Sequence, residues 1–298
     1  MEEIEAKRER GYCSRLGLAL LLVIVWALVW QFALLLLDGM LPVRLPDSVF
    51  YLLILAGHYA VSLPAAYALC RRVPRTPPAR RPAGARRMAR WFVIGAALMW
   101  LGSLAGTAVN NLAYRLAGRE PVDLLSEAFD LYSPAVILLG ACLLGPVCEE
   151  LLFRGLLAGR LARYGQKPAA LVSALLFGLF HANLGQFFYA FALGLLLAYA
   201  YFRTGGLAAP IVLHMLFNVY GSGLPTVLPA GDGPLLLYGL SWLALTAAGV
   251  ALLIGGRKKQ VWEHGPCAPS MRAVFVNCGM LLAVAACFIE LALNFVLV

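Results

Sequence analysis

Long apolar runs with almost no charged residues recur along the whole chain, and they limit it to one class of fold. A helix of about 20 apolar residues spans the hydrocarbon core of a bilayer. The alternating pattern of a transmembrane β-strand is absent. With 62% hydrophobic and 13% charged residues, the chain does not have the composition of a soluble domain. The sequence therefore predicts an all-α polytopic membrane protein.

We expect about eight or nine transmembrane helices, packed as a helical bundle in a single domain that covers residues 1–298. No internal repeat and no separate soluble domain is evident. Two of the nine apolar segments are shorter than a bilayer requires, so they are untilted, re-entrant or placed where the bilayer thins. The nine segments are 16–37, 48–70, 90–110, 132–158, 168–183 (short), 185–203, 206–222 (short), 234–255 and 273–297.

Basic residues are concentrated on one side of this predicted topology. Most of the 24 Lys and Arg residues precede the first segment or follow an even-numbered one. Since basic loops stay in the cytoplasm, we expect a cytoplasmic N-terminus and an external C-terminus. The net charge of +9 then also favours contact with anionic membrane lipid. No nucleic-acid partner is expected, because the basic residues border the apolar segments and lack interleaved aromatic residues.

A small group of polar residues lies inside the apolar segments. An ionisable group at the bilayer centre costs about 2.5–3.5 kcal/mol on insertion scales, and such groups are usually functional. A helical rise of about 1.5 Å per residue places these residues at a similar depth, near the midplane. They are Glu149, Glu150 and Arg154 in the fourth segment, His181 in the fifth, and His214 and Asn218 in the seventh.

The two adjacent glutamates cannot share one role. Glu150 and Arg154 are four residues apart, so they lie on one face of a helix and can pair. Glu149 is turned by about 100° from its neighbour. We therefore expect one carboxylate to be held by Arg154 while the other faces a cavity.

The later helices would each present a histidine to the same space. Phe177 and His181 are four residues apart, as are His214 and Asn218. A glutamate beside a histidine can activate water and pass the proton to a leaving amine. A His/Asn pair can donate hydrogen bonds to a developing oxyanion. These groups together suit amide hydrolysis.

Three sequence patterns, in order and on separate apolar helices, carry a family resemblance. They are E-E-x-x-x-R starting at Glu149, F-x-x-x-H starting at Phe177, and H-x-x-x-N starting at His214. The combination resembles the type II CAAX prenyl endopeptidases and their prokaryotic relatives, the CAAX-protease and bacteriocin-processing (Abi-like) family of intramembrane proteases. The resemblance says nothing about the first two segments or the last.

The resemblance implies a catalytic role for the acidic pair and the first histidine. Glu149 would activate the attacking water together with His181. Glu150 and Arg154 would support that geometry or bind the substrate backbone.

The resemblance also implies an oxyanion site made by His214 and Asn218, with Phe177 lining the substrate groove. The family has been described both as metal-dependent and as glutamate-based. H-x-x-x-N is not the zinc motif H-E-x-x-H, and zinc would need ligands from three helices. We predict a site without metal or other cofactor, with a divalent ion such as zinc as the open alternative.

The chemistry is expected within residues 132–222, with 1–131 as N-terminal scaffold helices and a basic cytoplasmic loop, and 223–298 as C-terminal scaffold helices. Cys148 is interpreted as a small packing residue, not a nucleophile. Glu290 and Asn294, a polar pair in the last segment, are interpreted as a helix contact.

The predicted function is that of an intramembrane endopeptidase, acting on a peptide or protein substrate at the membrane, with a cavity that opens laterally or toward the cytoplasm. A non-catalytic bacteriocin-immunity or interaction protein of the same fold is one alternative. A proton-coupled transporter that relays protons through Glu149, Glu150 and His181 is another, although no pair of broken helices occurs in corresponding halves. The Ala/Arg/Gly-rich composition indicates a bacterial cytoplasmic membrane. Substrate identity, prenylation and oligomeric state stay open.

Overall fold

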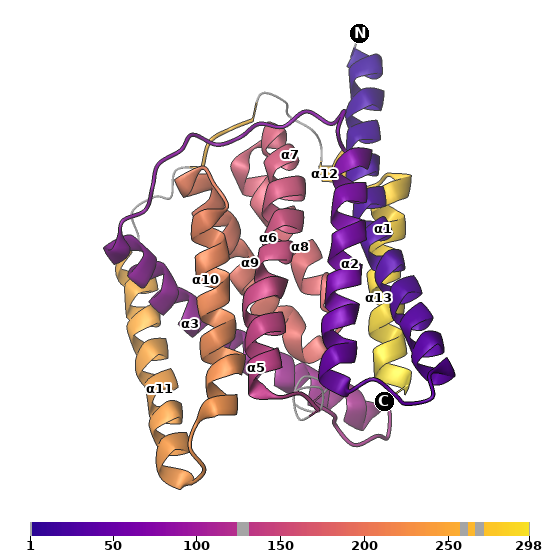
Figure 1. Cartoon of the computed structure of the whole chain (residues 1–298). Helices are drawn as coiled ribbons and strands as arrows, with labels where there is room; N and C mark the ends of the chain where they lie inside the picture. Colours follow the sequence, from indigo (N-terminus) through magenta and orange to yellow (C-terminus); the bar gives the residue numbers. More distant parts are fainter. Residues whose placement is uncertain (1, 124–130, 257–261, 266–270, 298) are drawn as a thin grey trace.

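The computed structural model describes residues 2–123, 131–256, 262–265 and 271–297, and every regular element in these ranges is a helix. The predicted all-α bundle is confirmed. Seven helical segments are long and apolar enough to cross a membrane. The two segments predicted to be short are occupied by the shorter helices α8 (Gln166–Phe180) and α10 (Ala208–Asn218), which lie between the outer helices in the view of Figure 1.

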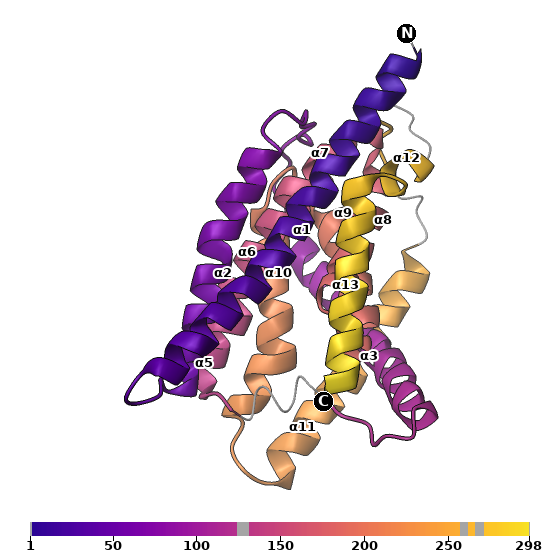
Figure 2. The ribbon, with the colours of Figure 1, turned by 90° about the vertical axis from the view of Figure 1, so that its right-hand side faces the viewer.

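The two ends of the chain pack together on one side of the bundle. The helices α1 (Glu2–Met40) and α2 (Asp47–Leu69) form a pair, and α13 (Cys278–Leu297) lies along α1 (Figure 2). At the crossing of α1 and α13, Gly17 and Gly279 leave no room for a side chain. The Gly279 backbone N–H donates to Ser14 Oγ at 3.0 Å. A short helix, α12 (Met271–Phe275), precedes α13.

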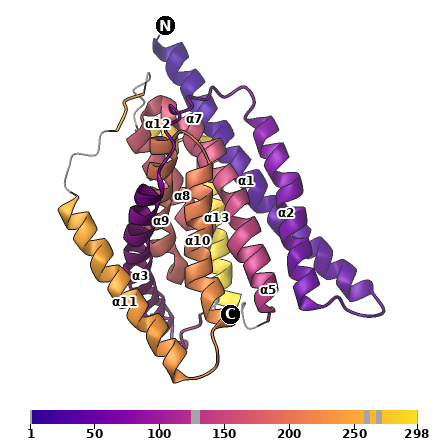
Figure 3. The same ribbon diagram turned by 60° about the vertical axis from the view of Figure 1, so that its left-hand side comes forward.

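The opposite side of the bundle is built from three long helices. They are α3 (Ala85–Leu116), α9 (Leu184–Thr204) and α11 (Asp232–Gly255). α3 packs against both of the others. In Figure 3, α3 and α11 lie on one side of α10, and α1 and α2 on the other.

The central segment from Pro134 to Tyr164 is helical throughout but changes its winding several times. Two π-helical stretches lie on either side of the glutamates, and a third directly follows Asn218. π-Helical turns widen a helix and are frequent at functional sites. The central elements are α5 (Pro134–Ile137), the π-helical η1 (Leu138–Leu144), α6 (Gly145–Glu150), the π-helical η2 (Leu151–Ala158), α7 (Gly159–Leu161) and the 3₁₀ turn η3 (Ala162–Tyr164); after α10 come the π-helical η4 (Val219–Gly223) and the 3₁₀ turn η5 (Leu224–Val227).

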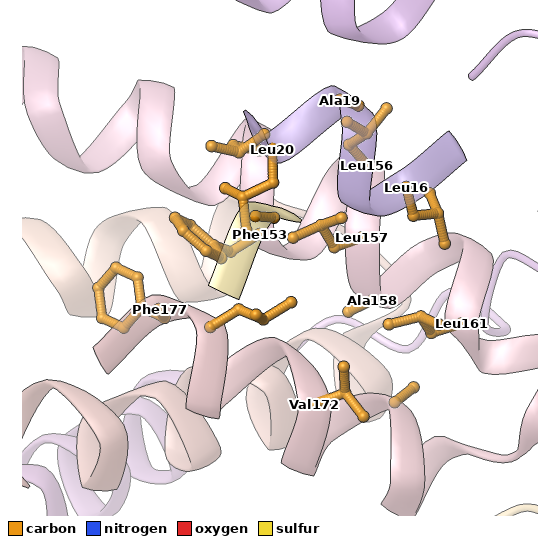
Figure 4. Packing of buried hydrophobic residues seen from close by; sticks show 14 of the residues in the cluster. Leu16, Ala19, Leu20, Phe153, Leu156, Leu157, Ala158, Leu161, Val172 and Phe177 are labelled. Carbon is orange, nitrogen blue, oxygen red and sulfur yellow. The ribbon is translucent and has the colours of Figure 1, made fainter. Parts of the chain in front are cut away.

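A dense apolar core fills the half of the bundle between the glutamates and the end of the central segment. Side chains of η2 and α7 meet α1 and α8 there (Figure 4). Each of the η2 and α7 members of this cluster is at most 1% exposed, so the core is closed to solvent. The labelled members are Leu16, Ala19, Leu20, Phe153, Leu156, Leu157, Ala158, Leu161, Val172 and Phe177.

The two termini lie at opposite ends of the bundle (Figures 1 and 2). An odd number of membrane crossings gives this arrangement. The number of long apolar helices in the described residues (seven) and the number of predicted segments (nine) are both odd.

Candidate active site

A fully buried ion pair anchors the site. Arg154 Nη1 lies 2.8 Å from Glu150 Oε1, and neither side chain is exposed. The predicted pairing of these two residues is confirmed. Arg154 Nη2 also donates to the carbonyl of Gly194 in α9 at 3.1 Å, and the guanidinium lies 4.6 Å from the centre of the Phe177 ring. The arginine thus joins η2, α8 and α9.

The second histidine is bound to the same carboxylate. His214 Nδ1 lies 2.9 Å from Glu150 Oε1. Because an ionised carboxylate only accepts, the Nδ1 atom carries the proton. In a neutral imidazole this leaves a lone pair on Nε2, which lies 3.7 Å from Glu149 Oε2.

Glu149 is the carboxylate that faces open space. Its side chain is 19% exposed, whereas that of Glu150 is fully buried. The expectation that one glutamate is held by Arg154 while the other faces a cavity is therefore confirmed.

His181 ends α8 and is fixed by its own helix. Its Nδ1 lies 2.8 Å from the carbonyl of Phe177, which can only accept, so Nδ1–H is the donor. The Nε2 atom again keeps a lone pair. The Phe177 ring is edge-on to both imidazoles, 4.8 Å from His181 and 5.5 Å from His214 between ring centres. One phenyl ring therefore fixes both histidines.

Asn218 connects α10 to the central segment. Its Nδ2 donates to the carbonyl of Ala141 in η1 at 2.8 Å. The amide carries a second N–H, which leaves one donor for another acceptor.

These residues open on one cavity of about 690 Å³. Glu149, Phe177, His181, His214 and Asn218 all line it, and Glu150 and Arg154 lie directly behind them. The predicted convergence of three helices on one space is confirmed.

The part of the chain that carries these groups matches a known family. Residues 131–220 match the family described as "Type II CAAX prenyl endopeptidase Rce1-like". Two curated proteins named as membrane peptidases match as well. This part of the chain is therefore similar to the CAAX protease family.

The two curated members of this family come from bacteria. The "Putative membrane peptidase YdiL" of Bacillus subtilis (strain 168) is 25% identical over 138 residues, which is 43% of this chain and 56% of that protein. The "Membrane-embedded CAAX protease MroQ" of Staphylococcus aureus (strain USA300) is 28% identical over 137 residues, 43% of this chain and 54% of that protein. The chain thus spans about half the length of these relatives. No solved structure matches.

Helices outside the matched segment also line the cavity. Tyr51 of α2, Trp100 of α3, and Tyr238 and Trp242 of α11 line it. Trp100 and Trp242 stack with their ring centres 5.5 Å apart. The flanking segments, interpreted from the sequence as scaffold, thus contribute aromatic side chains to the wall of the cavity. Their aromatic residues carry no motif, because their contribution depends on how distant helices pack.

The sequence did contain one unused signal for this packing, a G-x-x-x-G pattern at Gly102 and Gly106 of α3. Such patterns let helix backbones approach closely in a membrane. Both glycines lie against the start of α9, at Tyr189 and Gly185, with no room for a side chain.

The cavity extends toward the end of the bundle that lies away from the basic connections. Its lining includes Tyr51, Gly140, Pro225 and Leu235, which belong to the end of the bundle where α5 and α11 begin. Among the described lining residues, none follows Glu149 in the central segment. The apolar core lies on the side of the basic connections, and the expectation that the cavity opens laterally or toward the cytoplasm stays a prediction.

The donor atoms do not form a metal site in the described part of the chain. Glu149 and His214 approach each other, but no group of three or more His, Cys, Asp or Glu side chains in the described residues is placed to hold an ion. The prediction that the site works without a metal stays a prediction. Cys148 is half-buried and packs against the apolar core, as interpreted from the sequence.

Proposed function

We propose that this protein is an endopeptidase that hydrolyses a peptide bond of a membrane-associated peptide or protein within its central cavity. The observation that carries the proposal is the convergence of one solvent-accessible carboxylate and two imidazoles on a shared space. Each imidazole has its Nδ1 engaged, so each offers Nε2 to the cavity.

In the proposed reaction, Glu149 accepts one proton from a water molecule, whose other O–H donates a hydrogen bond to the Nε2 lone pair of His181. The water oxygen attacks the carbonyl carbon, and the carbonyl oxygen becomes an oxyanion. The proton then passes to the amine as the C–N bond breaks. Neither histidine has to move to take part, because Phe177 holds both rings.

Asn218 and His214 are proposed to stabilise the oxyanion. Asn218 has one N–H beyond the one that binds Ala141. His214 already donates from Nδ1 to Glu150, so it can donate from Nε2 only as an imidazolium. Preorganised donors of this kind contribute about 2.7–4 kcal/mol each to transition-state stabilisation.

The test uses the purified full chain in liposomes and a quenched-fluorescent reporter with an apolar membrane segment and a polar flank. Glu149→Gln keeps the shape of the side chain and should reduce turnover about a thousandfold or more. Glu290→Gln, which makes the same change in α13 away from the cavity, is the matched control. Turnover by Glu149→Gln at the unsubstituted rate rules out the proposed chemistry.

The same preparations separate the alternatives. Protection of cells against a bacteriocin by Glu149→Gln would favour a non-catalytic immunity protein. Proton-coupled flux that Glu150→Gln abolishes would favour a transporter. Cleavage that a chelator stops and zinc restores would replace the metal-free mechanism with a zinc-dependent one.

We also propose that the protein resides in a bacterial cytoplasmic membrane with its N-terminus in the cytoplasm. The distribution of basic residues supports this orientation. Both curated relatives are bacterial proteins, which supports the location.

A further inference from the structure

A second hollow, of about 400 Å³, lies beside the catalytic cavity and differs from it in chemistry. Its walls are mostly amide and hydroxyl side chains from the last turns of α3 and the start of α9. We call it the polar vestibule and define it by Ser103, Thr107, Asn111, Asn183, Gln186 and Tyr189. One acidic residue, Asp123, lines it as well. Three of these residues (Ser103, Gln186 and Tyr189) also line the catalytic cavity, so the two spaces adjoin.

The close crossing of α3 and α9 fixes the vestibule in place. Gly102 and Gly106 pack directly onto the backbone of α9. Ser103 and Thr107 are next to these glycines in the sequence and lie four residues apart, on one face of α3. The polar wall is thus set by the same contact that joins the two helices.

Polarity changes along the shared wall. Near the site, α9 contributes Ala190 and Leu193 to the cavity, whereas at its start it contributes Asn183 and Gln186 to the vestibule. From residue 183 to 193 the helix rises about 15 Å. An extended peptide of about four or five residues has this length, at about 3.3 Å per residue.

A peptide bond is cut in an extended segment, not inside a helix, and unwinding a helix exposes main-chain groups. At bilayer depth each unpaired N–H or C=O costs several kcal/mol. Amide side chains both donate and accept, and hydroxyl groups do the same, so they can pair with a main chain whatever its side chains. The vestibule offers both kinds of group from Asn183 to Tyr189, over a rise of about 9 Å.

We infer that the polar vestibule binds an extended hydrophilic segment of the substrate, next to the scissile bond, which enters from the membrane face opposite the basic connections. This inference rests on the proposed endopeptidase function. The opposite route is closed by the apolar core of η2 and α7. The end of the bundle that holds the vestibule is the end where α3 finishes and α9 starts, which the charge distribution places outside the cytoplasm.

The first experiment compares two liposome reporters that share one apolar segment, one with a four-residue Ser/Asn flank and one without it. In the double variant Thr107→Val/Asn111→Leu, KM for the flanked reporter should rise about tenfold while kcat stays within about twofold. KM for the unflanked reporter should stay unchanged. Thr246→Val in α11, outside both hollows, is the control.

An unchanged KM for the flanked reporter, or an equal rise for both reporters, overturns the inference. If the unsubstituted protein cleaves neither reporter, the proposed function fails too. If the unsubstituted protein cleaves the reporters and the double variant behaves in the same way, only the inference about the vestibule is refuted, and the proposed function is retained. The two failures are therefore distinguishable.

The second experiment tests the side of entry with Asn111→Cys and a bulky membrane-impermeant maleimide. Reagent on the external face of right-side-out vesicles should react with the new thiol and slow cleavage of the flanked reporter about tenfold. The unsubstituted protein, with its seven native cysteines, is the control for other reactions. Reaction from the cytoplasmic face alone, or external reaction without slower cleavage, overturns the inference.

Discussion

Phe177 shows why an aromatic residue belongs in a motif whose chemistry is carried by polar groups. Its ring face contacts the Arg154 guanidinium, and its edges contact both imidazoles. Its carbonyl accepts from His181. A single residue therefore sets the orientation of the two histidines relative to the buried ion pair, and no smaller apolar side chain makes all of these contacts.

Replacing Phe177 with leucine should lower kcat about tenfold to a hundredfold, since both imidazoles lose a ring that restrains them. Tenfold corresponds to about 1.4 kcal/mol of transition-state stabilisation. Steady-state kinetics in liposomes measures the effect. Phe202→Leu, a buried aromatic residue of α9 away from the cavity, is the control. Equal kinetics in the two variants would contradict the role given to Phe177.

Substitution of Glu150 should lower the stability of the protein, whereas substitution of Glu149 should lower its activity. Glu150→Gln leaves the Arg154 charge buried without its ionic partner, and breaking such a pair costs about 3–5 kcal/mol. Glu149→Gln alters a side chain that lines a cavity and should leave stability nearly unchanged. Thermal unfolding in detergent compares them. A smaller loss of thermal stability in Glu150→Gln than in Glu149→Gln would reverse the assignment of the structural and the catalytic carboxylate.

A hydrogen bond from the last helix reaches the turn that follows His181. Asn294 Nδ2 of α13 donates to the carbonyl of Ala182, directly after His181, at 3.0 Å. Ala182 has a φ of 47°, a left-handed conformation that costs a non-glycine residue about 1 kcal/mol or more. The contact holds a strained turn at the end of α8. The interpretation of Asn294 as a helix-contact residue is confirmed, and Asn294 itself lies outside the segment matched by the family.

Asn294→Leu should lower kcat about fivefold to tenfold with little change in KM, because the turn that carries His181 loosens while the substrate walls stay in place. Asn294→Gln, which keeps the amide, should recover part of the rate. Kinetics of both variants with one reporter provides the measurement. A change in KM alone would make Asn294 a residue of the substrate wall instead.

The parts of the site that were predictable from the sequence are those that depend on local spacing. Glu150 and Arg154 pair because four residues make one helical turn, and Glu149 faces away for the same reason. The bond between His214 and Glu150 joins residues far apart in the chain, so no spacing revealed it. The π-helical stretches η1, η2 and η4 were also unforeseen, because apolar residues support an α-helix equally well.

At the scale of the whole molecule, the number and order of the apolar helices followed from hydropathy, but the shape of the cavity did not. Hydropathy assigns each helix a depth and a direction. It does not say which helices touch. Residues of α2, α3 and α11 line the cavity together with the central segment, whereas α1 and α8 pack against η2 in the apolar core.

The termini should lie on opposite faces of the membrane. A reporter enzyme that is active only in the cytoplasm should work when fused to the N-terminus and fail at the C-terminus, and a reporter active only outside should give the reverse. Activity of the cytoplasmic reporter at both ends would require an even number of crossings.

A cavity that ends at Glu149 admits water only part of the way through the bundle. Beyond it, the turns from Leu152 to Leu161 are packed without exposed atoms or nearly so. Protons and small ions therefore find no continuous aqueous path through this part of the described fold. If the proposed hydrolysis takes place in this cavity, a cell would keep its reactive water within the membrane and still maintain the electrochemical gradient on which its energy supply depends.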